Sequence, residues 1–174
     1  MRPFLPLHIG FALCLLAGCA ASDSTSAPAG PALRLDAQSA PSWGPESPPF
    51  NDEIILRGDG FGLVKFRQPN DGDRIVYLDT RVIGLSPNTS YLLQRAVDAN
   101  VNDDCTGTAW LTLGMGTTPQ AITTDSRGTG EAALYRNLGA TAVGTKFDIH
   151  FRVIDATTSA VVLTSGCYQF TVSE

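Results

Sequence analysis

Apolar and polar residues alternate in short runs from about Asn51 to the end of the chain. The clearest run spans residues 146–153, in which every second residue is apolar: Phe147, Ile149, Phe151 and Val153. The residues between them are polar, namely Lys146, Asp148, His150 and Arg152. A period of two is the pattern of a half-buried β-strand, so the first set is predicted to face a core and the second set the solvent.

Further short apolar runs, bounded by Gly, Asn, Asp or Pro, predict strands along the rest of this region. They span residues 54–57, 63–67, 74–83, 91–97, 108–113, 121–124, 131–138 and 160–172. No segment places apolar residues convincingly at helical spacing. Many short strands joined by turns predict an all-β domain, built as an antiparallel sandwich or barrel.

Residues 20 to about 50 have a different texture, because Ala, Ser and Pro dominate them. Such a segment has too little apolar surface to offset its ordering entropy, and its prolines favour an extended chain. We therefore expect a disordered tether ahead of the β domain. Leu33, Leu35 and Trp43 are exceptions, and two interpretations stay open for them: isolated apolar residues, or a part of the tether packed along the domain.

Composition and charge narrow the classes of partner. The chain has 174 residues and a formal net charge of −5, which suits one domain with appendages. No cluster of Lys and Arg of the kind that neutralises phosphates is present, so nucleic acid is not expected as a partner. The same deficit argues against electrostatic docking onto anionic lipid headgroups.

The N-terminus carries a short positive start, Met1-Arg2, and an apolar run over residues 9–17. This run is shorter than the roughly 20 apolar residues of a membrane-spanning helix and suits the core of a signal peptide. The residues Leu16-Ala17-Gly18-Cys19 resemble the lipobox of bacterial lipoproteins. The resemblance implies a signal peptide over residues 1–18, cleavage before Cys19, and a covalent lipid with acyl chains such as palmitate on that cysteine. An ordinary secretory signal is the alternative.

The same resemblance carries implications for location. Two or three acyl chains, the usual number in this family, would anchor the protein to a membrane essentially permanently. The residue after Cys19 is Ala20, and not the Asp that tends to retain lipoproteins at the inner membrane. A cell-envelope location is therefore implied, at the outer membrane where the cell has two. The chain then divides into a signal peptide (1–18), a lipidated tether (19–50) and a β domain (51–174).

All four cysteines can be accounted for if the protein is an exported lipoprotein. Cys14 leaves with the signal peptide and Cys19 takes the lipid, which leaves Cys105 and Cys167 as an even pair in an oxidising compartment. We expect a disulfide between them. In the run 167–172 the apolar residues alternate away from Cys167, so the bond is predicted to clamp the loop 98–106 onto the outer face of the sheet, unless a bulge at Gly166 resets the parity.

Four residues spaced two apart, Leu85, Pro87, Thr89 and Tyr91, resemble the tyrosine corner of fibronectin type III and related immunoglobulin-like domains. In that motif the tyrosine hydroxyl bonds back to the chain a few residues upstream. The resemblance covers seven residues and implies an antiparallel immunoglobulin-like sandwich as the fold. Two features depart from those families: their corner lies close to the end of the domain, and the core Trp of antibody domains has no obvious counterpart here.

Candidate chemistry is sparse, and no catalytic residue is predicted. His150 is the single histidine that remains once the signal peptide is removed, and no G-x-S-x-G elbow supplies a nucleophile. One histidine and two paired cysteines also make a zinc site hard to build. A Ser–Lys dyad, or a pair of carboxylates from distant positions, stays open.

The acidic segment 98–104 opens like a calcium-binding loop, with Asp98, Asn100 and Asn102 at the first three ligand positions. Asp103 then stands where the turn glycine belongs, and the bidentate Glu is missing, so an EF-hand is rejected. A looser calcium site formed by Asp98, Asn100, Asn102 and Asp104 remains a hypothesis. A solvated turn between strands is the alternative.

Lipid, tether and β domain together favour a non-catalytic binding or structural module displayed in the cell envelope, with an unidentified envelope protein or glycan as its ligand. The recognition surface is expected in the loops 68–73, 98–106 or 125–130. The alternatives are an envelope hydrolase that uses dispersed acidic residues and a subunit of a larger envelope assembly. A cleft with two close carboxylates would favour the hydrolase, and an open sheet edge would favour the subunit.

Overall fold

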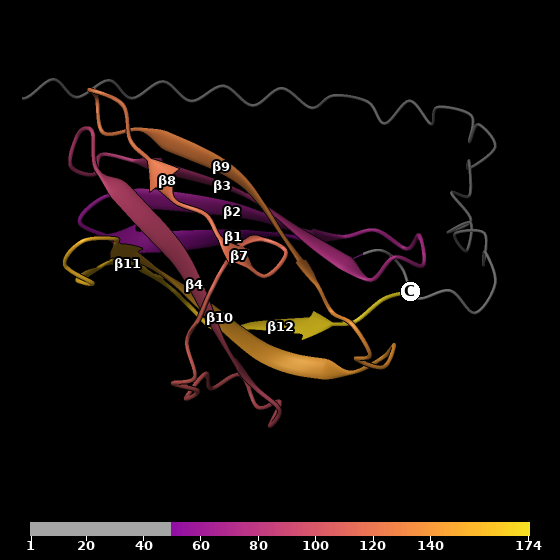
Figure 1. Ribbon diagram of the computed structural model, residues 1–174. Coiled ribbons are helices and arrows are strands. Elements are labelled where there is room, and N and C mark those ends of the chain that lie inside the picture. The colour runs from indigo at the N-terminus through magenta and orange to yellow at the C-terminus, as the bar shows by residue number, and fades with distance from the viewer. Residues whose placement is uncertain (1–49) are drawn as a thin grey trace, which may run out of the picture. The chain divides into compact units, whose positions relative to one another are not determined.

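A computed structural model describes residues 50–174, and these residues form an all-β domain without a helix (Figure 1). The predicted signal peptide, the lipobox with Cys19 and all of the predicted tether except Phe50 fall on residues 1–49, which lie outside the described residues. Phe50, predicted as the last residue of the tether, begins the first strand instead. Within the described domain, no helix has the length and apolar character needed to cross a bilayer.

The domain contains eight strands of four or more residues and four two-residue strands. The longer ones are β1 (Phe50–Gly58), β2 (Phe61–Gln68), β3 (Ile75–Ile83), β4 (Ser90–Asp98), β9 (Gly130–Asn137), β10 (Lys146–Asp155), β11 (Val161–Ser165) and β12 (Tyr168–Thr171). The short ones lie between β4 and β9 and are β5 (Leu111–Thr112), β6 (Gly114–Met115), β7 (Thr118–Pro119) and β8 (Ile122–Thr123).

The alternation of apolar and polar residues predicted the eight longer strands to within a few residues, whereas β6 and β7 lie outside the predicted runs. β10 confirms the predicted inner face, because Phe147, Ile149, Phe151 and Val153 all belong to or pack against the core. The one long run, 160–172, is divided into β11 and β12, which both pair with β10. The irregularity around Gly166 therefore breaks one strand into two.

All the strands belong to one hydrogen-bonded sheet that curls almost into a barrel. Its order is β5-β4-β10-β11-β1-β2-β3-β9-β6-β7, with β12 beside β10 and β8 beside β4. The two-residue strands join its two edges: β5 and β8 pair with β4, whereas β6 pairs in parallel with β9. The segment 111–123 thus bridges β4 and β9 along part of their length.

The fold prediction is confirmed at the level of an all-β domain, but an antiparallel immunoglobulin-like sandwich is not. The strands form one hydrogen-bonded sheet and not two, and its β6–β9 pair is parallel. The physical reason is the bridge of short strands, which joins edges that a sandwich would leave as the borders of two separate sheets. Residue patterning does not distinguish these solutions, because both bury one face of every strand.

Aromatic side chains fill the core at the end where the described chain begins. The Phe66 ring packs edge-on against Phe50 and Phe170, with ring centroids 5.1 and 4.9 Å apart, and against Phe151 at 6.0 Å. The C-terminal residues complete this end, because the buried Gln68 amide exchanges hydrogen bonds with the backbone of Ser173. Such edge-to-face pairs stabilise a core beyond the area that they bury.

The predicted corner residues hold the opposite end of the domain together. The hydroxyl of the buried Tyr91 accepts a hydrogen bond from the Ser86 backbone N–H at 3.1 Å. Leu85 is buried, and the Thr89 hydroxyl donates to the Pro87 carbonyl. The connection between β3 and β4 is therefore tied back to the start of β4.

Gly128 makes this corner sensitive to a single methyl group. Its φ is +76°, and a Cβ built there would lie 2.1 Å from the Leu85 carbonyl oxygen. The left-handed backbone alone costs an L-residue about 1–2 kcal/mol, and the clash with the backbone adds to this. Gly128→Ala should therefore lower the free energy of unfolding by about 2 kcal/mol or more in urea titrations. Gly139→Ala is the matched control, because its φ is +59° but nothing lies within 4 Å of the added Cβ. Equal effects of the two substitutions would contradict the close contact at Gly128.

Candidate functional site

The two ends of the bridged edge differ in how completely they close. Toward the corner, β8 pairs with Ser90 and Tyr91 at the start of β4. Further along, β5 pairs with β4 up to Arg95, and β6 pairs with β9 at Tyr135. Beyond these two residues no described strand lies between β4 and β9. The barrel is therefore open at this end, between the last residues of both strands.

Arginine occupies an inward-facing position on each of these two strands. On β4, Arg95 shares the inner face with Leu93 and Val97, since Arg95 pairs with the core residue Phe151. On β9, Arg136 follows the inner-face residues Ala132 and Leu134, and it pairs with Val76. Both guanidinium groups thus stand where the alternation calls for an apolar side chain.

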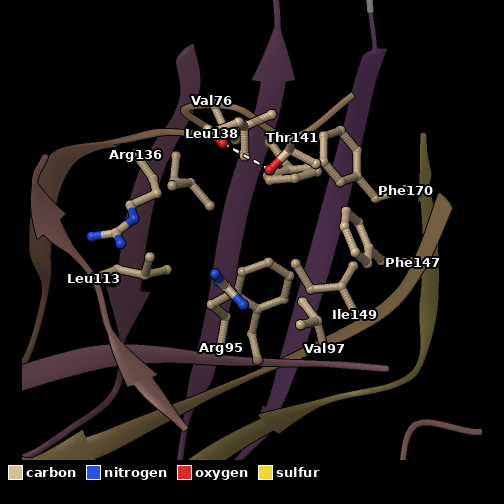
Figure 2. A pocket seen from close by; sticks show the side chains of 13 residues that line it. Val76, Arg95, Val97, Leu113, Arg136, Leu138, Thr141, Phe147, Ile149 and Phe170 are labelled. Carbon is tan, nitrogen blue, oxygen red and sulfur yellow. Dashed lines mark hydrogen bonds between the residues drawn. The ribbon is translucent and has the colours of Figure 1, made fainter. Parts of the chain in front are cut away.

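These arginines line an apolar cavity of about 90 Å³ at the open end. Apart from the two arginines and Thr141, all of its lining residues are apolar: Phe66, Val76, Leu78, Val97, Leu113, Leu138, Phe147, Ile149, Phe151 and Phe170. Figure 2 shows the Arg95 guanidinium in the middle of the view and the Arg136 guanidinium at its left, directed away from the rings of Phe147 and Phe170, with Leu113 between the two arginines in this view. No carboxylate is among the lining residues.

The electrostatics of the cavity are those of two uncompensated cations. Burial lowers the pKa of the Arg95 guanidinium, and the positive charge of Arg136 lowers that pKa further. Both causes disfavour the charged form, because a buried cation loses hydration and repels its like-charged neighbour. Arginine nevertheless stays protonated in proteins, so the cavity keeps both charges. The site is therefore selective for an anion on electrostatic grounds.

Contacts to the backbone fix the cavity wall on the β9 side. Arg136 Nη1 donates to the Gly116 carbonyl at 3.2 Å, and the Gly116 N–H donates to the Tyr135 carbonyl at 3.0 Å. The Thr141 hydroxyl is engaged as well, since it donates to the Leu138 carbonyl at 2.7 Å, the bond drawn in Figure 2. Arg136 is thereby held in place before any ligand arrives, which lowers the entropy cost of binding.

The outer face of β4 and β10 lies beneath the loop that carries the predicted disulfide. Cys105 and Cys167 are bonded, with their Cα atoms 5.4 Å apart. The loop that Cys105 belongs to lies against β10, because Asp148 Oδ2 accepts hydrogen bonds from the N–H groups of Asn102 and Asp103. The prediction that this loop is clamped onto the exterior of the sheet is confirmed.

The solvated position predicted for Asp148 is wrong. Its side chain is on the outer face, as predicted, but it is fully buried. The loop covers it, and such coverage cannot be read from strand parity. Asp98, its partner across the ladder, acts in the same way, because Asp98 Oδ2 accepts from the N–H groups of Thr106 and Gly107.

His150 and Arg152 complete the contact between this loop and β10. The Trp110 ring lies 4.6 Å from the His150 ring, and the Arg152 guanidinium lies 4.0 Å from the Trp110 centroid. His150 Nε2 is also 3.0 Å from the Gly107 carbonyl oxygen. These side chains are engaged with one another and with the backbone, and they hold the loop in place.

The four residues of the calcium hypothesis all belong to the clamped loop or its base. The Asp98 carboxylate accepts the two backbone hydrogen bonds given above, and Asn102 Oδ1 accepts a hydrogen bond from the Asp104 N–H. Asn100 and Asp104 are exposed. Within residues 50–174 no three His, Cys, Asp or Glu side chains are grouped as metal ligands usually are. The calcium site stays a prediction.

The loops 68–73 and 125–130, which were also expected to contain a recognition surface, form local turns. Asp71 Oδ1 accepts from the Asp73 N–H, and Asp125 Oδ1 accepts from the N–H groups of Thr129 and Arg127. These backbone bonds, that of Thr129 first, lower the pKa of the Asp125 carboxyl. Neither loop, nor the loop 98–106, contributes a residue to the cavity.

No family model and no curated protein sequence matches this chain.

Sequence reasoning missed Arg95 and Arg136, although the sequence contains the signal that identifies them. In the predicted strand 91–97 the inner positions are Tyr91, Leu93, Arg95 and Val97, and in 131–138 they are Ala132, Leu134, Arg136 and Leu138. A charged residue that interrupts a buried face is informative because such positions are rarely charged without a partner. That the two arginines share one cavity depends on the bridge between β4 and β9, which the pattern does not reveal.

Proposed function

We propose that this protein is a lipid-anchored lipoprotein of the cell envelope whose β domain is a non-catalytic binding module, with its site in the cavity at the open end of the barrel. The observation that carries the binding role is a concave, apolar site lined by two arginines. Small-molecule sites commonly have this character. An immunoglobulin-like relationship enters the proposal through the corner at Leu85–Tyr91 alone.

The lipid anchor is supported by the lipobox Leu16-Ala17-Gly18-Cys19 and by the disulfide, since disulfides persist outside the reducing cytosol. Where the cell has two membranes, we propose that the protein is anchored to the outer one. The cavity shifts the proposed ligand from an envelope protein or glycan to a small molecule, because the cavity is far too small for a macromolecular surface.

The anchor is tested by replacing Cys19 with Ser. The wild-type protein should sediment with membranes and incorporate labelled palmitate, whereas Cys19→Ser should do neither, because the acylated thiol is gone. Cys14→Ser is the matched control and should behave as the wild type does. If Cys19→Ser still sediments with membranes and carries label, the lipoprotein assignment is wrong.

The binding role is tested with six-carbon compounds that share one tail and differ in head group: neutral, anionic and cationic. At least one should raise the melting temperature, because a ligand that binds only the folded state stabilises it. Val97→Phe should abolish this ligand-induced shift by filling the cavity, while Val161→Phe, on the exposed outer side of β11, should keep it. If no compound shifts the wild-type protein, or Val97→Phe responds like it, the cavity is not a binding site.

A further inference from the structure

The two arginines of the cavity have no acidic partner among the described residues. The ion pairs of residues 50–174 are Arg67 with Asp79 and Arg81 with Glu131, all with exposed side chains. Other acidic residues near the open end are already engaged, since Asp98 and Asp148 accept backbone N–H bonds on the outer face. Asp52 of β1 has an inner-face register position, opposite Phe66, but it forms no ion pair with either arginine. The lining of the cavity therefore carries two positive charges and no negative charge to balance them.

This arrangement opposes stability. Both arginines are half-buried, and a half-buried cation without an acidic partner loses part of its hydration energy, while two like charges at one site repel each other. Aliphatic residues at positions 95 and 136 would satisfy the alternation of β4 and β9 and would extend the apolar wall. A charged residue on an apolar strand face, with no acidic partner in the free protein, is expected where a bound ligand supplies the opposite charge.

The chemistry of the lining defines that ligand. Guanidinium groups match the geometry of an oxyanion and bind a carboxylate through parallel, charge-assisted hydrogen bonds. The remaining wall accepts only apolar groups, and the two phenyl rings of Phe147 and Phe170 flank the space opposite the arginines (Figure 2).

The size of the cavity limits the tail. About 90 Å³ is smaller than the roughly 150 Å³ of a cavity known to hold benzene, so a single short chain fits and a two-chain lipid does not.

We infer that the cavity binds a carboxylate with one short apolar tail, the carboxylate held between Arg95 and Arg136 and the tail placed among the side chains around Phe147 and Phe170. This inference rests on the proposed function, of which it specifies the ligand. The carboxylate supplies the missing negative charge, and the tail displaces water from the apolar wall. Neither part suffices alone: acetate lacks the tail, and hexanol lacks the charge.

The test is isothermal titration of the full chain, carrying Cys19→Ser to remove the acylation site, with hexanoate, 1-hexanol, hexylamine and acetate. Hexanoate should bind at least tenfold more tightly than each of the other three. Arg95→Gln and Arg136→Gln should each weaken hexanoate binding at least tenfold and leave the affinity for 1-hexanol unchanged or higher. Arg81→Gln removes the same charge from the outer face of β3 and should change neither affinity.

A second variant separates a ligand-binding arginine from one that serves the fold. Arg95→Met should raise the melting temperature of the ligand-free protein, because it removes an unbalanced, half-buried charge, and should lose hexanoate binding. A lower melting temperature would mean that Arg95 supports the fold, and the inference would be overturned. Equal binding of hexanoate and 1-hexanol would also overturn it but would leave the binding role intact. If none of the four compounds binds, both the inference and the proposed function fail.

Discussion

Replacing Cys105 and Cys167 together with alanine is expected to lower the free energy of unfolding by about 4 kcal/mol. The two cysteines are 62 residues apart, and closing a loop of this size removes that much conformational entropy from the unfolded chain. The bond also holds the loop that covers Asp148, so the alanine variant should expose that carboxylate. Urea titrations followed by circular dichroism measure the change.

The control for this experiment is the wild-type protein in reducing agent, which breaks the same bond without changing a side chain. It should lose a similar free energy of unfolding, and the reducing agent should have no further effect on the double alanine variant. A loss below about 1 kcal/mol would contradict the disulfide as a major constraint, because the entropy of the unfolded chain would then be nearly unchanged.

The second large effect is expected for Asp148→Ala. The Asp148 side chain is fully buried, and its Oδ2 accepts hydrogen bonds from the N–H groups of Asn102 and Asp103 at 2.7 and 2.8 Å. Removing the carboxylate leaves two N–H donors in part-buried hydrogen bonds without their acceptor, and a hydrogen bond to a charged group contributes about 1.5–3 kcal/mol. We expect a loss of about 3 kcal/mol in the free energy of unfolding.

Asp104→Ala is the matched control, since Asp104 is exposed in the same loop. Surface substitutions of this kind change stability by about 0.5 kcal/mol or less. Hydrogen exchange adds a local readout, because the amides of Asn102 and Asp103 should lose protection in Asp148→Ala and keep it in Asp104→Ala. Slow exchange of these two amides in Asp148→Ala would contradict the role assigned to the carboxylate.

Both substitutions concern the outer face of β4 and β10, and the cavity lies on their inner face. β4 has no β5 partner beyond Arg95, so its last residues depend on β10 and on the loop clamped over both strands. The clamp therefore supports the part of β4 that carries Arg95 and Val97 into the cavity. Sites built on supported strands hold their geometry better than sites on loops.

Local patterning was sufficient for much of this fold. The period of two in residues 146–153 predicted which side chains of β10 face the core, and the parity of 167–172 predicted that Cys167 would clamp a loop from outside. Both inferences depend only on the pleat of a strand, which neighbouring elements do not change.

Features that depend on contacts between distant segments were not predictable in this way. The sheet becomes nearly a barrel through two-residue strands that are too short to leave a pattern. Asp148 is buried because a loop some 45 residues upstream folds over it. The cavity exists because Arg95 and Arg136, 41 positions apart, flank one opening. The sequence alone could have identified each arginine as an exception to the apolar alternation of its strand. It could not have shown that the two arginines line the same cavity.

The most direct test of the account is to locate the ligand by methyl NMR during a hexanoate titration of the full chain carrying Cys19→Ser. The account predicts shifts concentrated in the methyl groups that line the cavity, those of Val76, Val97, Leu113, Leu138 and Ile149, with little change at Leu56 and Leu163 toward the other end of the core. Absence of shifts at saturating hexanoate, or shifts centred on methyl groups outside the cavity, would contradict it.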